Sequence, residues 1–269
     1  MDSKSISINE LNSSLRLNWI DQVKGFTIFL VVYGHNFPDL EKYIYSYHMP
    51  LFIMIAGFFH PTSSNFISVK KRFKTIILPY FFWGLSLFVF WYLIGRKYGE
   101  NLKFELSPLK NFIGIFYSQG GREYMDWGIP LWYLPAIFMM FLFFSFLQKI
   151  NNTKIFIFSS LVLVSLGFAY TRFFSINLPW SINIAMVGLF FYFFGNQFLD
   201  KINYISKNKS IVLMLIMGVL NLILFSYNIK IDMYRAIYGN EFLFILNGIT
   251  GSIFILLFFK NFPIFSFLS

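Results

Sequence analysis

The 269-residue sequence has no cysteine, which excludes disulfide bonds, thiolate metal sites and cysteine nucleophiles. Charged residues are also scarce, at 13% of the chain. Apolar side chains take their place, because 57% of the residues are hydrophobic, 39 residues are Phe and the mean hydropathy is +0.61. A soluble fold would leave much of this surface in exposed apolar patches. The composition therefore predicts a membrane protein whose first partner is the lipid bilayer.

The net charge of +10 does not indicate nucleic acid. Lys and Arg are spread over short connections between apolar runs instead of forming one basic groove. We therefore expect no nucleic-acid partner, and we expect neither a metal site nor a permanently bound cofactor.

Eight apolar runs are long enough to cross about 30 Å of hydrocarbon. They predict an all-α, polytopic transmembrane helix bundle, preceded by a polar tail over 1–15, with 16–269 as one domain. A ninth apolar run begins at Pro263 and is too short to span, so we expect a chain that is truncated inside a further helix. The eight runs are 19–38, 43–59, 76–94, 131–147, 155–171, 180–198, 211–227 and 242–259.

The distribution of basic residues predicts an N-terminus in the cytoplasm of a bacterial-type inner or cell membrane. Cytoplasmic connections carry an excess of Lys and Arg, and this orientation collects most of the basic residues on one side. These residues are Lys70, Lys71, Arg72, Lys74, Lys149, Lys154, Lys201, Lys207, Lys209 and Lys260.

The first apolar run contains three ionisable residues, Asp21, Lys24 and His35. Eleven residues of α-helix amount to about three turns, so Lys24 and His35 share one face about 16 Å apart. Charges at this depth are costly and usually face the bundle interior or a water-filled path. The alternative is an interfacial anchor, in which Lys24 snorkels beside Asp21 and His35 is hydrated at the outer rim.

His35 is the best candidate for a catalytic base, because a neutral imidazole can accept a proton from a hydroxyl near neutral pH. His48 opens the second run on the same side of the membrane and is the next candidate. His60 falls on the opposite side, where we expect it in a loop.

A basic cluster, Lys71, Arg72 and Lys74, precedes the third run and could bind phosphates, although such clusters also stop translocation or contact anionic lipids. Near the outer surface, Trp132, Asp232 and Asn240 are candidate acceptor-binding residues. An aromatic belt and an ordinary turn explain these three residues equally well.

Together these residues resemble the acyltransferase-3 family of integral membrane O-acyltransferases, and most closely its fucose 4-O-acetylase-like branch. The resemblance rests on four blocks that keep the family's order. They are Asp21-x-x-Lys24-Gly with ten residues before His35, His48-Met-Pro-Leu-Phe through Phe58, basic residues before Pro-Tyr over 71–80, and Leu-Trp-Tyr-Leu-Pro over 131–135.

The resemblance implies about ten helices and transfer of an acetyl group from acetyl-CoA, a co-substrate, to a hydroxyl of a cell-surface or lipid-linked sugar. Lys71, Arg72 and Lys74 would bind the donor. His35 would deprotonate the hydroxyl or carry the acyl group. Lys24 and Asp21 complete the catalytic set, and Lys24 would also hold CoA phosphates at the inner face. A transporter or flippase for a polar glycan precursor is the main alternative, and a glycan polymerase is a third.

Overall fold

A computed structural model describes residues 18–36, 39–98, 106–228 and 230–262 of the protein. The predicted tail over 1–15 and the run that begins at Pro263 lie outside these ranges. Within the described residues every regular element is a helix, and the one β feature is an isolated bridge between Asp232 and Ile237. The predicted all-α bundle is confirmed.

Six helical segments of the described chain are long and apolar enough to cross a membrane. The first of them is continuous from Phe66 to Lys97 and joins α5 (Phe66–Arg72), a π-helical turn (Phe73–Ile77), α6 (Leu78–Leu93) and a 3-10 turn (Gly95–Lys97). The others are α9 (Tyr133–Leu147) with its preceding 3-10 turn (Ile129–Trp132), α10 (Thr153–Phe173), α11 (Ile182–Asn203), which also follows a 3-10 turn, α12 (Lys207–Tyr227) and α13 (Glu241–Asn261).

The second predicted span, 43–59, is wrong as one crossing helix. It divides into α3 (Glu41–Tyr45) and α4 (His48–Phe58). The 11 residues of α4 rise only about 16 Å, roughly half of the hydrocarbon thickness. The first predicted span forms α2 (Asn18–Gly34), which at 17 residues lies at the lower limit for crossing.

The basic cluster also differs from the sequence prediction, because it lies on a helix and not in a loop. Asn65 begins α5 with a capping box, in which its side chain accepts a hydrogen bond from the Ser68 amide and its own amide donates to Ser68 Oγ. The helix then continues through Lys71, Arg72 and Lys74 into the π-helical turn and α6.

A close helix crossing joins α4 to α11 through two glycines. A Cβ atom on Gly57 would lie 2.0 Å from the carbonyl oxygen of Tyr192. A Cβ atom on Gly195 would lie 1.9 Å from the carbonyl oxygen of Met54. Only glycine permits this approach of two backbones, which is the usual way that membrane helices pack tightly. The crossing fixes α4, and with it His48, in the middle of the molecule.

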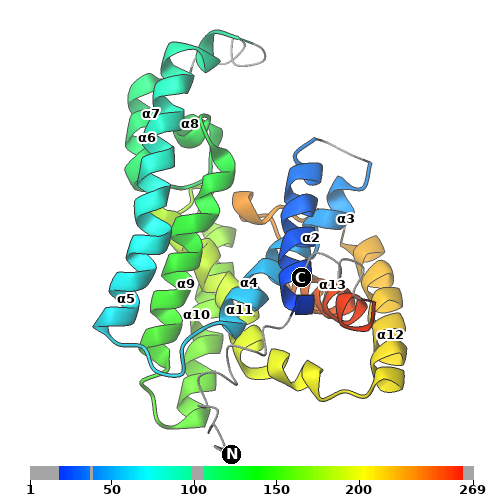
Figure 1. Ribbon diagram of the computed structural model, residues 1–269. Helices are drawn as coiled ribbons and strands as arrows, with labels where there is room; N and C mark the ends of the chain where they lie inside the picture. Colours follow the sequence, from blue (N-terminus) through cyan, green and yellow to red (C-terminus); the bar gives the residue numbers. More distant parts are fainter. Residues whose placement is uncertain (1–17, 37–38, 99–105, 229, 263–269) are drawn as a thin grey trace, which may run out of the picture.

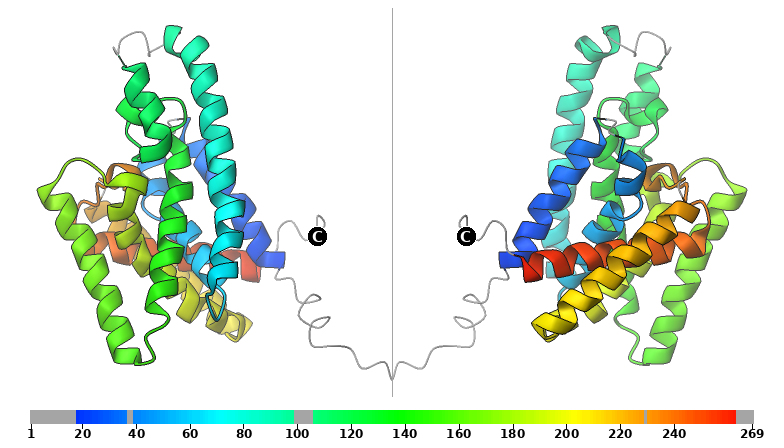
Figure 2. Two further views of the ribbon diagram at one scale, coloured as in Figure 1. Left: turned by 90° about the vertical axis from the view of Figure 1, so that its left-hand side faces the viewer. Right: turned by 90° about the vertical axis from the view of Figure 1, so that its right-hand side faces the viewer.

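Figure 1 shows α5, α6, α9 and α10 on one side of the bundle, with α7 (Pro108–Tyr117) and α8 (Arg122–Met125) at one end. On the other side lie α2, α3, α12 and α13, and α4 and α11 lie between the two groups. Figure 2 shows that the α12–α13 hairpin lies at a steep angle to α6 and α9.

Candidate functional site

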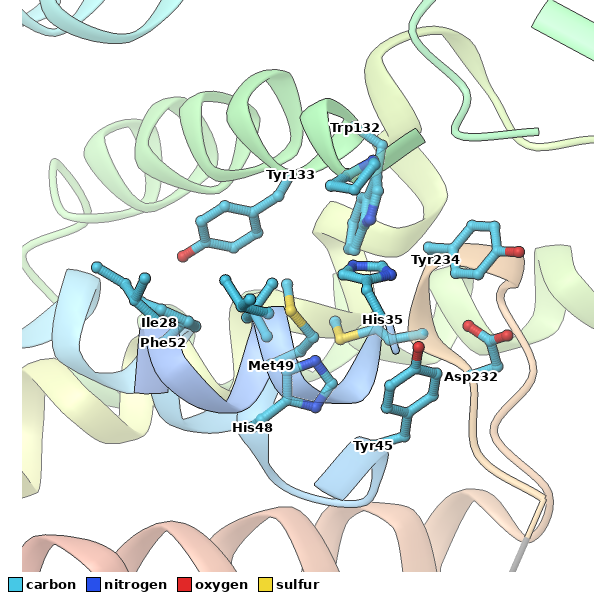
Figure 3. A pocket seen from close by; sticks show the side chains of 14 residues that line it. Ile28, His35, Tyr45, His48, Met49, Phe52, Trp132, Tyr133, Asp232 and Tyr234 are labelled. Carbon is cyan, nitrogen blue, oxygen red and sulfur yellow. The ribbon is translucent and has the colours of Figure 1, made fainter. Parts of the chain in front are cut away.

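A cavity of about 280 Å³ lies where α2, α4, the start of α9 and the connection between α12 and α13 meet. Figure 3 shows the side chains that surround it. They comprise two histidines, one carboxylate, several aromatic rings and a set of aliphatic groups. The lining residues are Ile28, Val31, Val32, His35, Tyr45, His48, Met49, Phe52, Pro130, Trp132, Tyr133, Asp232, Met233 and Tyr234.

One face of α2 forms a wall of the cavity. Its residues are Ile28, Val31, Val32 and His35. Ile28 lies three and four residues before the two valines, and His35 lies three and four residues after them, which is the spacing of one helical face. Lys24 lies one turn beyond Ile28 and does not line the cavity, nor does Asp21. The cavity therefore extends from His35 along α2 in the direction of Lys24.

The structure brings His35 and His48 to the same cavity, as Figure 3 shows. His35 follows the last residue of α2 and is exposed, and its amide donates to the carbonyl of Val31. His48 is buried, and its Nδ1 lies 2.8 Å from the carbonyl oxygen of Ile44. Because a carbonyl oxygen only accepts, Nδ1 carries the proton and Nε2 of His48 is left as the basic nitrogen.

A short loop between α12 and α13 brings a carboxylate into the cavity. Asp232 and Ile237 exchange backbone hydrogen bonds of 2.8 and 2.9 Å, which close the loop. Burial raises the pKa of Asp232 to about 6, although Arg235, 3.5 Å from its carboxylate, opposes the shift. At neutral pH this group is therefore mostly a carboxylate, which accepts a hydrogen bond from a ligand hydroxyl.

Aromatic rings cover much of the remaining wall. Figure 3 shows Trp132 and Tyr234 at the end of the cavity that holds His35 and Asp232. Tyr133 and Phe52 lie toward the other end. The sequence predicts Trp132 and Asp232 as site residues but not Tyr234, because no motif surrounds Tyr234 and only the folded loop places it beside the cavity.

A second group of polar residues meets at Phe59, beyond the Lys24 end of the cavity. Lys24 Nζ lies 3.1 Å from Asp21 Oδ1 and 4.1 Å from the centre of the Phe59 ring. Arg72 donates from Nη2 to the carbonyl oxygen of the same Phe59 at 3.2 Å. Of the predicted donor-binding residues, Arg72 is thus brought to Lys24, whereas the side chains of Lys71 and Lys74 are exposed.

Behind Phe59 lies a buried polar cluster centred on His60. His60 Nδ1 lies 2.7 Å from Tyr192 Oη, and His60 Nε2 lies 3.0 Å from Ser64 Oγ. Burial lowers the pKa of His60 to about 4, and the positive charge of Arg72 acts in the same direction. His60 is non-helical, as predicted for a loop residue, but it is buried and paired.

Asn240 does not line the cavity. Its side chain accepts a hydrogen bond of 3.0 Å from the amide of Leu243 and caps the N-terminus of α13. Within the described ranges, no three His or acidic residues gather closely enough to hold a metal ion.

A family model described as an acyltransferase domain matches residues 17–269, nearly the whole chain. Comparison with curated proteins gives no significant match. Comparison with solved structures gives none either.

Proposed function

The chain belongs to the acyltransferase-3 family, and from this premise we propose that it moves an acetyl group from acetyl-CoA to a hydroxyl of a cell-surface or lipid-linked sugar. As a member of that family it is a multi-pass membrane acyltransferase. The observation that carries the finer proposal is the shared cavity of His35 and His48, with a carboxylate and aromatic rings beside them.

The reaction assigns His35 the role of general base. Its imidazole accepts the proton of the sugar hydroxyl while the hydroxyl oxygen attacks the thioester carbonyl carbon. The carbon–sulfur bond then breaks, and the departing thiolate takes the proton back from the imidazolium. The products are an acetyl ester and free CoA. A two-step route, in which His35 carries the acyl group first, gives the same products.

The donor approaches from the Lys24 end of α2. Arg72 and Lys24 converge on Phe59, so both cations can contact phosphates or the adenine ring of CoA. Lys71 and Lys74 lie on the same helical segment and add positive charge. The pantetheine arm then follows the apolar face of α2, past Ile28 and Val31, to His35.

The acceptor enters at the opposite end, where Asp232 contacts its hydroxyls and the rings of Trp132 and Tyr234 cover its apolar faces. Sites for small polar ligands commonly combine aromatic walls with a few placed polar groups. His48 lies deeper and helps to hold the acceptor next to His35.

This assignment requires the Lys24 end to face the cytoplasm, where acetyl-CoA is made, and therefore a cytoplasmic N-terminus. Reporter fusions after residue 72 should report the cytoplasm, and fusions near residue 110 should report the outer side. The reverse pattern would separate the basic cluster from the donor and would contradict the assignment.

The function is tested by mass analysis of the surface glycans of a strain that lacks this gene. We expect the glycans of this strain to be lighter by about 42 Da for each acetyl group that is missing. The wild-type gene should restore the acetyl group, and the gene for His35→Ala should not. Glycans of unchanged mass together with an accumulated precursor would favour the transporter instead.

A further inference from the structure

Three connections on the side of the bundle that holds His35 meet at the side chain of Asn177. Asn177 Nδ2 donates to the carbonyl oxygens of Gln119 at 3.0 Å and Tyr234 at 3.1 Å. Its Oδ1 accepts a hydrogen bond of 2.9 Å from Asn183, at the start of α11. One carboxamide thus joins three loops, and we call them together the loop junction. They are the loops over 118–121, 174–181 and 232–237.

Two further hydrogen bonds fix Asn177 itself. Tyr117 Oη, at the end of α7, donates to the Asn177 carbonyl oxygen at 3.2 Å. Asn183 Oδ1 accepts from the amide of Leu178, next to Asn177, at 3.0 Å. Asn183 is almost completely buried, so the loop junction is anchored in the protein interior.

Backbone strain is concentrated in the loop junction. Among the residues that the structure describes, the non-glycine residues with positive φ are Ser118, Trp180, Ser181 and Ala236. Each of them lies in one of the three loops. Left-handed conformations are unfavourable for such residues and persist only where surrounding contacts enforce them, which is a common property of functional sites.

The loop junction lies directly behind the aromatic wall of the cavity. Gly120 has a φ of +79°. A Cβ atom built on it would lie 3.2 Å from the Cβ of Trp132 and 3.5 Å from the ring of Tyr234. The loop over 118–121 is therefore packed against both rings. Since Asn177 holds the backbone of this loop and that of Tyr234, it sets how far apart the two rings lie.

We infer that Asn177 is a positioning residue that holds Tyr234 opposite Trp132, and that these two rings form the wall that binds the sugar of the acceptor. The inference rests on the proposed function for the identity of the ligand. Asn177 itself does not line the cavity and acts through the loop over 232–237.

The absence of cysteine from the sequence permits a test that needs no substrate. Met233 lies in the same loop and is only 3% exposed, so a cysteine in its place should react slowly with a maleimide. In the Met233→Cys protein, Asn177→Ala should raise the labelling rate about tenfold, because two hydrogen bonds to the loops are lost. Tyr117→Phe removes one hydroxyl without disturbing the packing and should raise the rate about threefold.

Asn111→Ala is the matched control. Asn111 is also a buried carboxamide that holds backbone of another segment, since it donates to the Glu123 carbonyl in α8 and accepts from the Asp126 amide, but it lies outside the loop junction. It should leave the labelling rate unchanged. An unchanged rate in Tyr117→Phe and in folded Asn177→Ala, or an equal rise in Asn111→Ala, would overturn the positioning role. Should Asn177→Ala not fold, Tyr117→Phe decides.

Enzyme kinetics then test the ligand. In active protein, Asn177→Ala should raise the acceptor KM about tenfold, while kcat and the KM for acetyl-CoA stay within about twofold. Faster labelling without a change in acceptor KM would refute the binding of the sugar by Tyr234 and Trp132, but not the positioning role of Asn177. A wild-type protein that transfers no acetyl group would refute the proposed function, and the labelling result would still stand.

Discussion

His35 and His48 line one cavity from two different helices, His35 just after the end of α2 and His48 at the start of α4. The two imidazoles differ in how they are held. His48 is fixed by its hydrogen bond to the Ile44 carbonyl, whereas His35 is exposed. This difference separates a residue that shapes the cavity from one that can exchange protons with a ligand.

His48→Asn should preserve the fold and lower kcat only about tenfold. The shorter carboxamide keeps a donor near the Ile44 carbonyl, so the buried oxygen remains paired, while one polar contact to the ligand is lost. Steady-state kinetics on purified protein give the value. A loss of several thousandfold in His48→Asn would make His48 the base instead of His35.

The basic residues at the Lys24 end should act on the donor alone. Replacing Lys71, Arg72 and Lys74 together with Gln should raise the KM for acetyl-CoA at least about tenfold, because charge-assisted contacts to phosphate are lost. Arg72→Gln should account for most of the rise, since Arg72 shares Phe59 with Lys24.

The double substitution Lys207→Gln and Lys209→Gln is the control, because both residues are exposed at the start of α12. It should leave the donor KM unchanged. An equal rise in the control would assign the effect to general surface charge, and no rise in the triple variant would return the cluster to a role in topology or lipid binding.

Lys260 should be required for stability and not for chemistry. From the last turn of α13 its ammonium donates to the carbonyls of Ile202 and Asn203, at the end of α11, and of Ile205, just beyond it. Lys260→Met should cost about 2 kcal/mol of unfolding free energy, because hydrogen bonds from a charged donor are lost. Thermal unfolding in detergent should show a lower midpoint for Lys260→Met and almost none of this effect for Lys201→Met, whose ammonium is exposed over the Phe198 ring.

Stability should also fall in mild acid because of His60. Its pKa is lowered to about 4 in the folded protein, against about 6.5 for an unfolded chain. Below pH 6.5 the unfolded state therefore binds a proton that the folded state does not, so stability declines progressively as the pH falls from about 6.5 to about 4. His60→Gln, which does not titrate, should flatten this part of the unfolding curve. An equal slope in both proteins would show that other groups cause the acid sensitivity.

The sequence was sufficient for the helix class and for most of α2, because both follow from apolar length and helical period, although the predicted run over 19–38 extends beyond the last residue of α2, Gly34. Helical spacing placed Lys24 and His35 on one face, and the structure shows the intervening Ile28 and Val31 on that face of the cavity. The division of 43–59 into α3 and α4 was missed, since the apolar run continues through the break. Hydropathy does not detect a turn at Ser46 and Tyr47.

The far wall of the cavity could not be predicted, because it depends on tertiary contacts between distant loops. Tyr234 has no distinguishing neighbours in sequence, and its position follows from Asn177, to which it is hydrogen bonded across the fold. Asn240 shows the opposite case. The sequence allowed either ligand binding or an ordinary turn at this polar residue, and its side-chain hydrogen bond to the amide of Leu243 is that of a helix cap.

The role of His35 as the base of acyl transfer is tested by the transfer rate of purified His35→Ala with labelled acetyl-CoA. We expect the rate to fall by about 10²-fold to 10⁴-fold, or by more if His35 carries the acyl group, with unchanged thermal unfolding. Asn36→Ala is the matched control, since Asn36 is the exposed neighbour, does not line the cavity and donates from its side chain to the carbonyl of Val32. Near-normal transfer by His35→Ala, or an equal loss in Asn36→Ala, would contradict the assignment of His35 as the base.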